Sequence, residues 1–173
     1  SPEPWRQDVA KASPLNTLPT FHCLDTFAGM PKNDEENFIF NTGTFHGELD
    51  LVKQKLQANN PLGLDIEYYK GLFSDTGDAL KKKLGNRPIA IANIDCDLMS
   101  STTDSLKIIE DHLQVGSILL FDDFNSFNAD NQKGQRKSLS EFQKTSRFIF
   151  EPFFSYFYTG MAYLVVDKSN KKS

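Results

Sequence analysis

The stretch "PIAIANIDCD", residues 88–97, decides the fold class of this chain. Its apolar run predicts a strand, and the strand ends in two acids, Asp95 and Asp97. A second apolar run, "SILLFDDF", ends in another acidic pair, Asp122 and Asp123. Isolated buried charges are costly, so these acids need a metal, a proton to move, or solvation at the edge of a sheet.

Apolar runs of strand length alternate with segments of helical periodicity along the rest of the chain. Strands are expected at 20–27, 64–73, 88–95 and 117–124, with a terminal antiparallel hairpin at 147–154 and 161–166, and helices at 4–12, 46–57, 75–86, 101–116 and 133–145. This alternation predicts an α/β fold with a mostly parallel sheet. The inner strands are apolar throughout, as expected where helices cover both faces of a sheet.

Composition restricts the class of protein. The 173 residues suit a single domain, 1–173, and 39% hydrophobic residues suffice for a packed core. A net charge of −4 does not predict a nucleic-acid partner, and no apolar run approaches the ~20 residues that span a bilayer. Cys23 and Cys96 are expected to be free core thiols. With no signal peptide visible, we expect a cytoplasmic protein.

The acids fall where α/β sheets bind ligands, beyond the carboxyl ends of the strands. Three carboxylates at one point repel each other unless a cation offsets their charge, and oxygen ligands suit Mg²⁺, Mn²⁺ or Ca²⁺. We therefore interpret Asp95, Asp122 and Asp123 as metal ligands, although single acids at such positions also cap helices or form turns. Asp97 could take a proton from a metal-bound hydroxyl. Asp25 could accept a hydrogen bond from a ribose, or form a turn.

Six motifs occur here in the order found in one enzyme family. They are "FHCLDTFAGMP", "GTFHGEL", "YYKGLFSDT", "IANIDCDLMSSTTDSL", "VGSILLFDDF" and "KGQRKSLSEF". Over roughly residues 20–165 the chain resembles the macrocin and related sugar O-methyltransferases, which are class I S-adenosylmethionine-dependent enzymes. Met99 departs from the family pattern, in which tyrosine is common at this position.

The resemblance implies a Rossmann-like class I methyltransferase sheet and an O-methyltransferase that uses S-adenosylmethionine and Mg²⁺. The substrate it implies is a sugar or a glycosylated small molecule, and it is compatible with a homodimer. It assigns the Mg²⁺ ligands to Asp95, Asp122 and Asp123, and the general base to Asp97. The stretch "MPKNDEENFIF" would be a lid that closes over the substrate.

The resemblance also implies a cofactor-binding set. It assigns the cofactor ribose to Asp25, and places Ser74 and Asp75 near the adenine. Asp95 completes the residues that we expect on the cofactor side of the site.

One departure from the family concerns the start of the chain. The family's first strand and the glycine-rich loop after it should precede residue 20, and residues 1–19 contain no glycine. That strand would lie between the strands that end at Asp25 and Asp95, and a sheet without it would leave backbone groups unpaired. Either preceding residues of a longer protein supply it, or the two flanking strands pair directly and cofactor binding is lost.

Two other functions stay open at this point. A methyltransferase-like domain without its cofactor could serve binding or assembly. A metal-dependent nucleotide-sugar glycosyltransferase also holds its metal with an Asp-x-Asp pair at a strand end. Binding of S-adenosylhomocysteine would favour the methyltransferase, and binding of a nucleotide diphosphate sugar with Mn²⁺ the glycosyltransferase.

Overall fold

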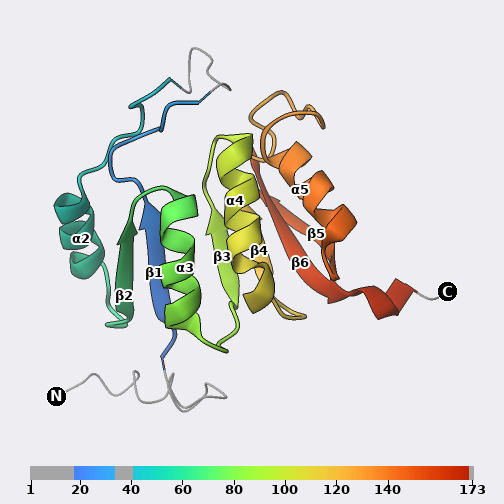
Figure 1. Cartoon of the computed structure of the whole chain (residues 1–173), viewed down its shortest axis with the longest axis horizontal. Helices are drawn as coiled ribbons and strands as arrows, with labels where there is room; N and C mark the ends of the chain where they lie inside the picture. The colour runs from blue at the N-terminus through green and yellow to red at the C-terminus, as the bar shows by residue number, and fades with distance from the viewer. Residues whose placement is uncertain (1–17, 34–40, 172–173) are drawn as a thin grey trace.

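A computed structural model describes residues 18–33 and 41–171 of the chain (Figure 1). The elements are β1 (Thr20–Asp25), α2 (Leu49–Ala58), β2 (Asp65–Lys70), α3 (Phe73–Leu84), β3 (Ile91–Ile94), α4 (Met99–Ile109), η1 (Glu110–His112), β4 (Ile118–Phe121), α5 (Gly134–Thr145), β5 (Phe148–Tyr156), β6 (Gly160–Asp167) and η2 (Lys168–Lys171). Their alternation confirms the α/β class. The helix predicted at 4–12 lies outside the described residues.

The strands form two hydrogen-bonded sheets. β1 and β2 pair in parallel, and a second sheet has the order β3-β4-β6-β5. β3 and β4 are parallel, whereas β6 is antiparallel to both β4 and β5, which confirms the C-terminal hairpin. β1 and β3 are neighbours in Figure 1 but do not pair with each other among the described residues. The alternative in which these two strands pair directly is therefore wrong.

The core lies between the four-stranded sheet and helices α3, α4 and α5, which Figure 1 shows over one face of the strands. Burial alternates along β4, where Leu119 and Phe121 are fully buried and the residues between them are only partly covered. Ile91 in β3 is 60% exposed. The expectation that helices cover both faces is therefore wrong for the described part of this sheet. The apolar composition of its strands did not reveal that one face is only partly covered.

Helix and hairpin boundaries differ from those predicted. α4 begins at Met99, two residues before the predicted start at residue 101, and it ends at Ile109, whereas the predicted helix ran on to residue 116. The hairpin strands run on to Tyr156 and Gly160, which pair across a three-residue turn, whereas the sequence predicted a six-residue connection. Cys23 and Cys96 are both free, as expected.

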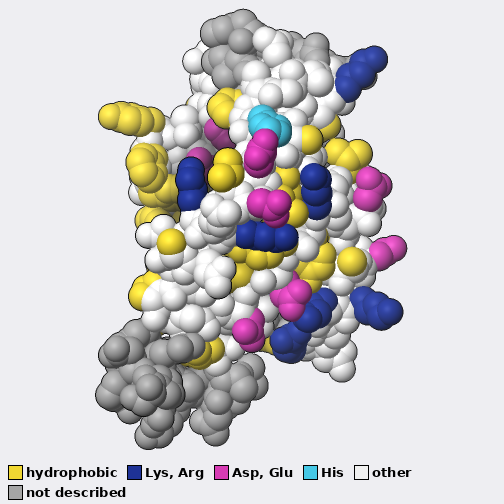
Figure 2. Space-filling view, turned by 90° about the vertical axis from the view of Figure 1, so that its left-hand side faces the viewer, with side chains coloured by type: hydrophobic (Ala, Val, Ile, Leu, Met, Phe, Trp, Pro, Cys, Tyr) yellow, Lys and Arg dark blue, Asp and Glu magenta, His cyan; other side chains and the backbone are white. Residues whose placement is uncertain are grey.

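Charged side chains of both signs are interspersed on the side of the molecule that carries α2 (Figure 2). Lys83 of α3 contacts Glu67 of β2 at 2.6 Å, and Lys53 contacts Asp50 within α2 at 3.8 Å. This face therefore presents no stripe of a single charge. No helix in the described part of the chain is long and apolar enough to cross a membrane.

Candidate functional site

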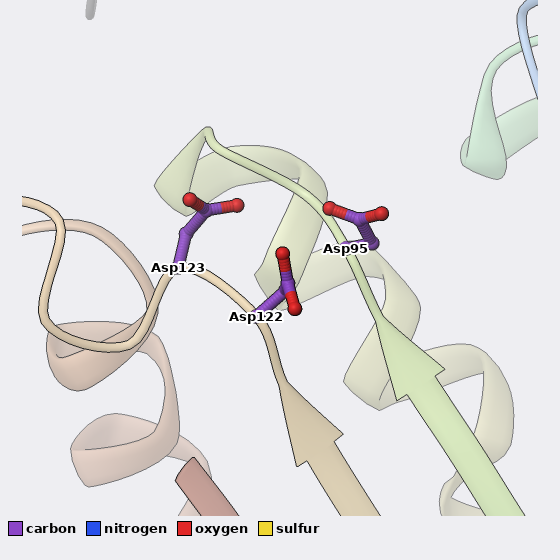
Figure 3. A group of neighbouring side chains, drawn as sticks. All are labelled: Asp95, Asp122 and Asp123. Carbon is purple, nitrogen blue, oxygen red and sulfur yellow. The ribbon is translucent and has the colours of Figure 1, made fainter. Parts of the chain in front are cut away.

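Three carboxylates meet where β3 and β4 end. Asp95 follows β3, Asp122 and Asp123 follow β4, and one oxygen of each lies within 4.8 Å of the other two. Figure 3 shows the three side chains grouped just beyond the ends of these two strands. The parallel register, with Ile94 opposite Phe121, brings the two strand ends level. The structure thus brings together the three acids that the sequence predicted as metal ligands.

Asp97 lies beside this group. Its side chain is half-buried and shares a hydrogen bond with the carboxyl group of Asp123. Burial raises the pKa of Asp97 to about 7, and the negative charges of Asp123 and Asp95 act in the same direction. A carboxyl group with a pKa near neutrality can both accept and release a proton at physiological pH.

The pKa values of two further acids, Asp95 and Asp123, are also raised. Burial raises the pKa of Asp95, followed by the charges of Asp122, Asp123 and Asp25. Burial likewise raises the pKa of Asp123, although hydrogen bonds from Ser126 and Asp97 oppose the shift. Like charges at one point are unfavourable, so a divalent cation bound here would lower the free energy of the ionised cluster.

The side chain of Gln135 hydrogen-bonds to both segments that carry the acids, the one at the end of β3 and the one at the end of β4. This side chain in the first turn of α5 is 1% exposed. Its Nε2 donates to the carbonyls of Ile94 at 2.8 Å and Cys96 at 3.2 Å, and its Oε1 accepts from the backbone N–H of Asp123 at 3.0 Å. One amide therefore fixes the end of β3 relative to the end of β4. Sequence reasoning assigned Gln135 no role, although a glutamine on the apolar face of a helix was a signal for one.

A small apolar cluster lies under the loops of the site. Met30 from the loop after β1 and Leu98 from the loop after β3 are buried against each other, with Phe127 from the loop after β4 packed on them. A side chain at Gly134 would overlap the Phe127 ring, with contacts of 2.6 and 2.7 Å. The loops that follow three strands are therefore packed into one surface.

The residues predicted to bind the cofactor lie at the ends of β1 and β2. Asp25 ends β1, and its side chain accepts a hydrogen bond from the backbone N–H of Phe27. The N–H of Gly71, just beyond β2, donates to the carbonyl of Asp25 at 3.0 Å. Ser74 and Asp75 are exposed in the first turn of α3, where the hydroxyl donates to the carboxylate at 3.2 Å. The pKa of Asp95 is raised chiefly by burial, and the charge of Asp25 makes the smallest contribution.

Backbone hydrogen bonds join the first residue of the segment predicted as a lid to residues just beyond its end. The N–H of Met30 donates to the carbonyl of Thr44, and the N–H of Gly43 donates to the carbonyl of Met30, each at 2.8 Å. A Cβ at Gly29 would lie 2.7 Å from the carbonyl oxygens of both Gly43 and Thr44, so only glycine fits there. Residues 34–40 of the predicted lid lie outside the described residues.

The sequence profile of one family, described as Macrocin-O-methyltransferase (TylF), matches residues 16–163. This match covers most of the chain and all of the site described above. No curated protein matches the sequence significantly.

Solved structures share the fold. The O-methyltransferase NovP superposes with a TM-score of 0.66 at 17% identity, over 85% of this chain and 60% of NovP. CalS11, a TDP-rhamnose 3'-O-methyltransferase of calicheamicin biosynthesis, gives 0.61 at 17% identity, over 92% and 63% of the two chains. An O-methyltransferase from Bacillus cereus, solved in complex with SAH, gives 0.50 at 16% identity, over 68% and 57%. The chain thus spans about three fifths of the length of these enzymes.

We expect Gln135→Glu to destabilise the fold by about 2–4 kcal/mol, because it replaces two buried donors by an acceptor facing the carbonyls of Ile94 and Cys96. Urea unfolding measures the free energy. The matched control is Gln132→Glu, an exposed position before α5, where no comparable loss is expected. Equal stability of the two variants would show that the Gln135 bridge contributes nothing.

Without a divalent cation, we expect the chain to lose stability as the pH rises from about 4 to about 7. A pKa raised in the folded state, as that of Asp97 is to about 7, gives stability that is present at low pH and lost as the pH passes the folded value. Allowing for solvent screening of a half-exposed group, the contribution is about 1–2 kcal/mol.

Thermal unfolding in a chelator across this pH range measures the slope. Asp97→Asn should flatten it, whereas Asp78→Asn at an exposed position of α3 should leave it unchanged. A slope that Asp97→Asn does not alter would contradict the raised pKa.

Proposed function

The chain belongs to the macrocin O-methyltransferase family, and from this premise we propose that it forms part of a site that methylates a hydroxyl group of a sugar. The observation that carries the proposal is the convergence of Asp95, Asp122 and Asp123, with Asp97 hydrogen-bonded at its edge. Family membership favours this function over the glycosyltransferase interpretation. The sugar acceptor is supported by the fold shared with CalS11, which acts on TDP-rhamnose.

The donor set fits Mg²⁺. It consists of carboxylate oxygens alone, gathered within 4.8 Å, and hard cations of this kind prefer such ligands. The raised pKa values of Asp95 and Asp123 are what ligands have before a cation offsets their mutual repulsion. When bound, Mg²⁺ would lower the pKa of a hydroxyl group that it coordinates. Asp95, Asp122 and Asp123 would hold it.

The cofactor side fits S-adenosylmethionine in part. Asp25, at the end of β1, offers a carboxylate of the kind that accepts hydrogen bonds from ribose hydroxyls. Ser74, Asp75 and Asp95 border the same end of the strands. When bound, the cofactor would supply an electrophilic methyl group.

We assign to Asp97 the role of taking the proton of the acceptor hydroxyl. Its carboxylate can receive that proton as the hydroxyl oxygen becomes nucleophilic, and a pKa of about 7 suits a base that works near neutrality. In its protonated form the carboxyl group of Asp97 donates a hydrogen bond to Asp123, one of the proposed metal ligands. The base and the cation would therefore act on the same oxygen from adjacent positions.

Calorimetry with S-adenosylhomocysteine tests the proposed function. We expect the chain to bind it, and Asp25→Asn to weaken binding by about 10-fold, the effect of one hydrogen bond to a charged group. Asp50→Asn in α2 is an exposed acidic control that should bind like the unaltered chain. Absence of binding by the unaltered chain would instead favour a methyltransferase-like binding domain.

Two further variants separate the metal from the base. We expect Asp122→Ala to abolish Mg²⁺ binding by the chain, measured as the heat released or absorbed in a calorimetric titration with the cation. Asp97→Asn should lower turnover of a sugar acceptor by about 10²–10⁴-fold while leaving affinity for S-adenosylhomocysteine within about 3-fold. Asp111→Asn, an exposed acid in η1, is the control for both. Turnover that survives Asp97→Asn would refute the assignment of the base.

A further inference from the structure

A cavity of about 210 Å³ is lined by residues of α5, of the loop after β4 and of β6. A single ordered water needs about 10–15 Å³, so the cavity has room for a polyatomic ion. The lining side chains that can donate hydrogen bonds are Asn131, Arg136, Ser140, Gln143 and Tyr163. No acid is among the described residues that line it, and none of them belongs to the acidic cluster beyond β3 and β4. The cavity is therefore separate from the site described above.

Arg136 contributes the positive charge of this cavity. Its Nε donates to Oδ1 of Asn131 at 2.8 Å and its Nη1 to Oδ1 of Asn125 at 2.6 Å. Its Cζ lies 4.9 Å from the centre of the Phe124 ring. These neutral partners orient the guanidinium group without neutralising it, and they leave N–H donors unused. None of the ion pairs among the described residues involves Arg136.

The two other arginines that the structure describes have a different environment. Arg87 donates to two carbonyls at the end of α3, and Arg147 donates to two carbonyls in and just after η1. Carbonyls at the end of a helix carry partial negative charge, which offsets a nearby cation. Arg136 instead lies in the first turn of α5, which contains no acid and where the helix dipole disfavours a cation. Its charge is thus available to a ligand in the cavity.

Tyr163 of β6 adds a buried donor to the same cavity. The residue is only 8% exposed, and its ring packs against Phe121 and Phe124 with centroid distances of 5.8 and 5.3 Å. Its hydroxyl forms no hydrogen bond with another described residue. A polar group this deep in the fold is normally paired, so an acceptor in the cavity would complete its hydrogen bonding.

We propose that this cavity binds a phosphoryl anion, either inorganic phosphate or a phosphate group of a nucleotide. A phosphoryl group offers several strong acceptor oxygens to donors that approach from different directions. Arg136 and Gln143 lie two turns apart on one face of α5, Asn131 lies in the loop after β4, and Tyr163 lies in β6. Because the Oδ1 of Asn131 already accepts from Arg136, the amide nitrogen of Asn131 remains as a donor. The inference goes beyond the proposed function and does not depend on it.

The test is a titration of the metal-free full chain with inorganic phosphate, followed by ³¹P nuclear magnetic resonance. Sodium chloride keeps the ionic strength constant, so general screening does not change during the titration. We expect saturable binding of phosphate. Arg136→Gln should weaken it by about 10–100-fold, because the charged hydrogen bond to the anion is lost.

Lys137→Gln is the matched control. It removes the same charge from the next residue of α5, which does not line the cavity. We expect its phosphate affinity to stay within about 2-fold of that of the unaltered chain, since a charge in contact with solvent contributes little. Equal losses in Arg136→Gln and Lys137→Gln would overturn the inference, because they would show general attraction of anions to a basic surface.

Gln143→Glu tests the cavity without altering the contacts of Arg136. Gln143 forms no hydrogen bond with another described residue, so thermal unfolding in chloride should show a variant as stable as the unaltered chain. The added carboxylate should repel the anion and weaken phosphate binding at least about 10-fold. This variant tests the site even if Arg136→Gln does not fold. Unchanged phosphate affinity in Gln143→Glu would overturn the inference.

Titration with TDP separates the two sources of the phosphoryl group. TDP is the nucleotide part of TDP-rhamnose, on which CalS11 acts. Binding of TDP that is tighter than that of phosphate and is weakened by Gln143→Glu would assign the cavity to a nucleotide-linked ligand. Equal affinities would assign it to free phosphate. Absence of saturable binding of both by the unaltered chain would overturn the inference and leave the proposed function standing, because no acid of the cluster lines the cavity.

Discussion

The hydrogen bonds of one buried amide hold the acidic site in register. Gln135 reaches from α5 to the carbonyls that end β3 and to the N–H that follows β4. β3 and β4 have only four residues each, so their ladder is short, and a side chain that binds both exits adds the constraint that a longer sheet would supply. These bonds flank Asp95 and end on Asp123, so the connection helps to hold these two acids in place.

That constraint keeps like charges together against their repulsion. The carboxyl groups of Asp95, Asp97 and Asp123 all have raised pKa values, so the folded chain carries an electrostatic cost at neutral pH. Sites that bind cations are typically strained in this way before the cation arrives. Under the proposed function, relief of this electrostatic cost favours Mg²⁺ binding, and the raised pKa makes Asp97 a stronger base.

The turn of the C-terminal hairpin lies beside the acidic segment that follows β4. β6 pairs with β4 in antiparallel orientation, so the turn between β5 and β6 lies at the same end as the carboxyl ends of the parallel strands. Thr159 fastens that turn to Asp122, and Gly160 makes room for Tyr156. The hairpin that the sequence predicted at the C-terminal end of the fold is thus hydrogen-bonded to the segment that carries Asp122.

The sequence by itself determined the α/β class and the strand ends that carry Asp25, Asp95 and Asp122. Period and strand-end position are local properties, and they survive folding unchanged. It left open whether β1 and β3 pair with each other, and it did not reveal that one face of β4 is only partly covered or that Gln135 joins the ends of β3 and β4. Those features depend on which residues far apart in the chain meet, and only the tertiary structure decides that. A glutamine 12 residues beyond Asp123 acquires its role from hydrogen-bond geometry and burial, which spacing along the chain does not encode.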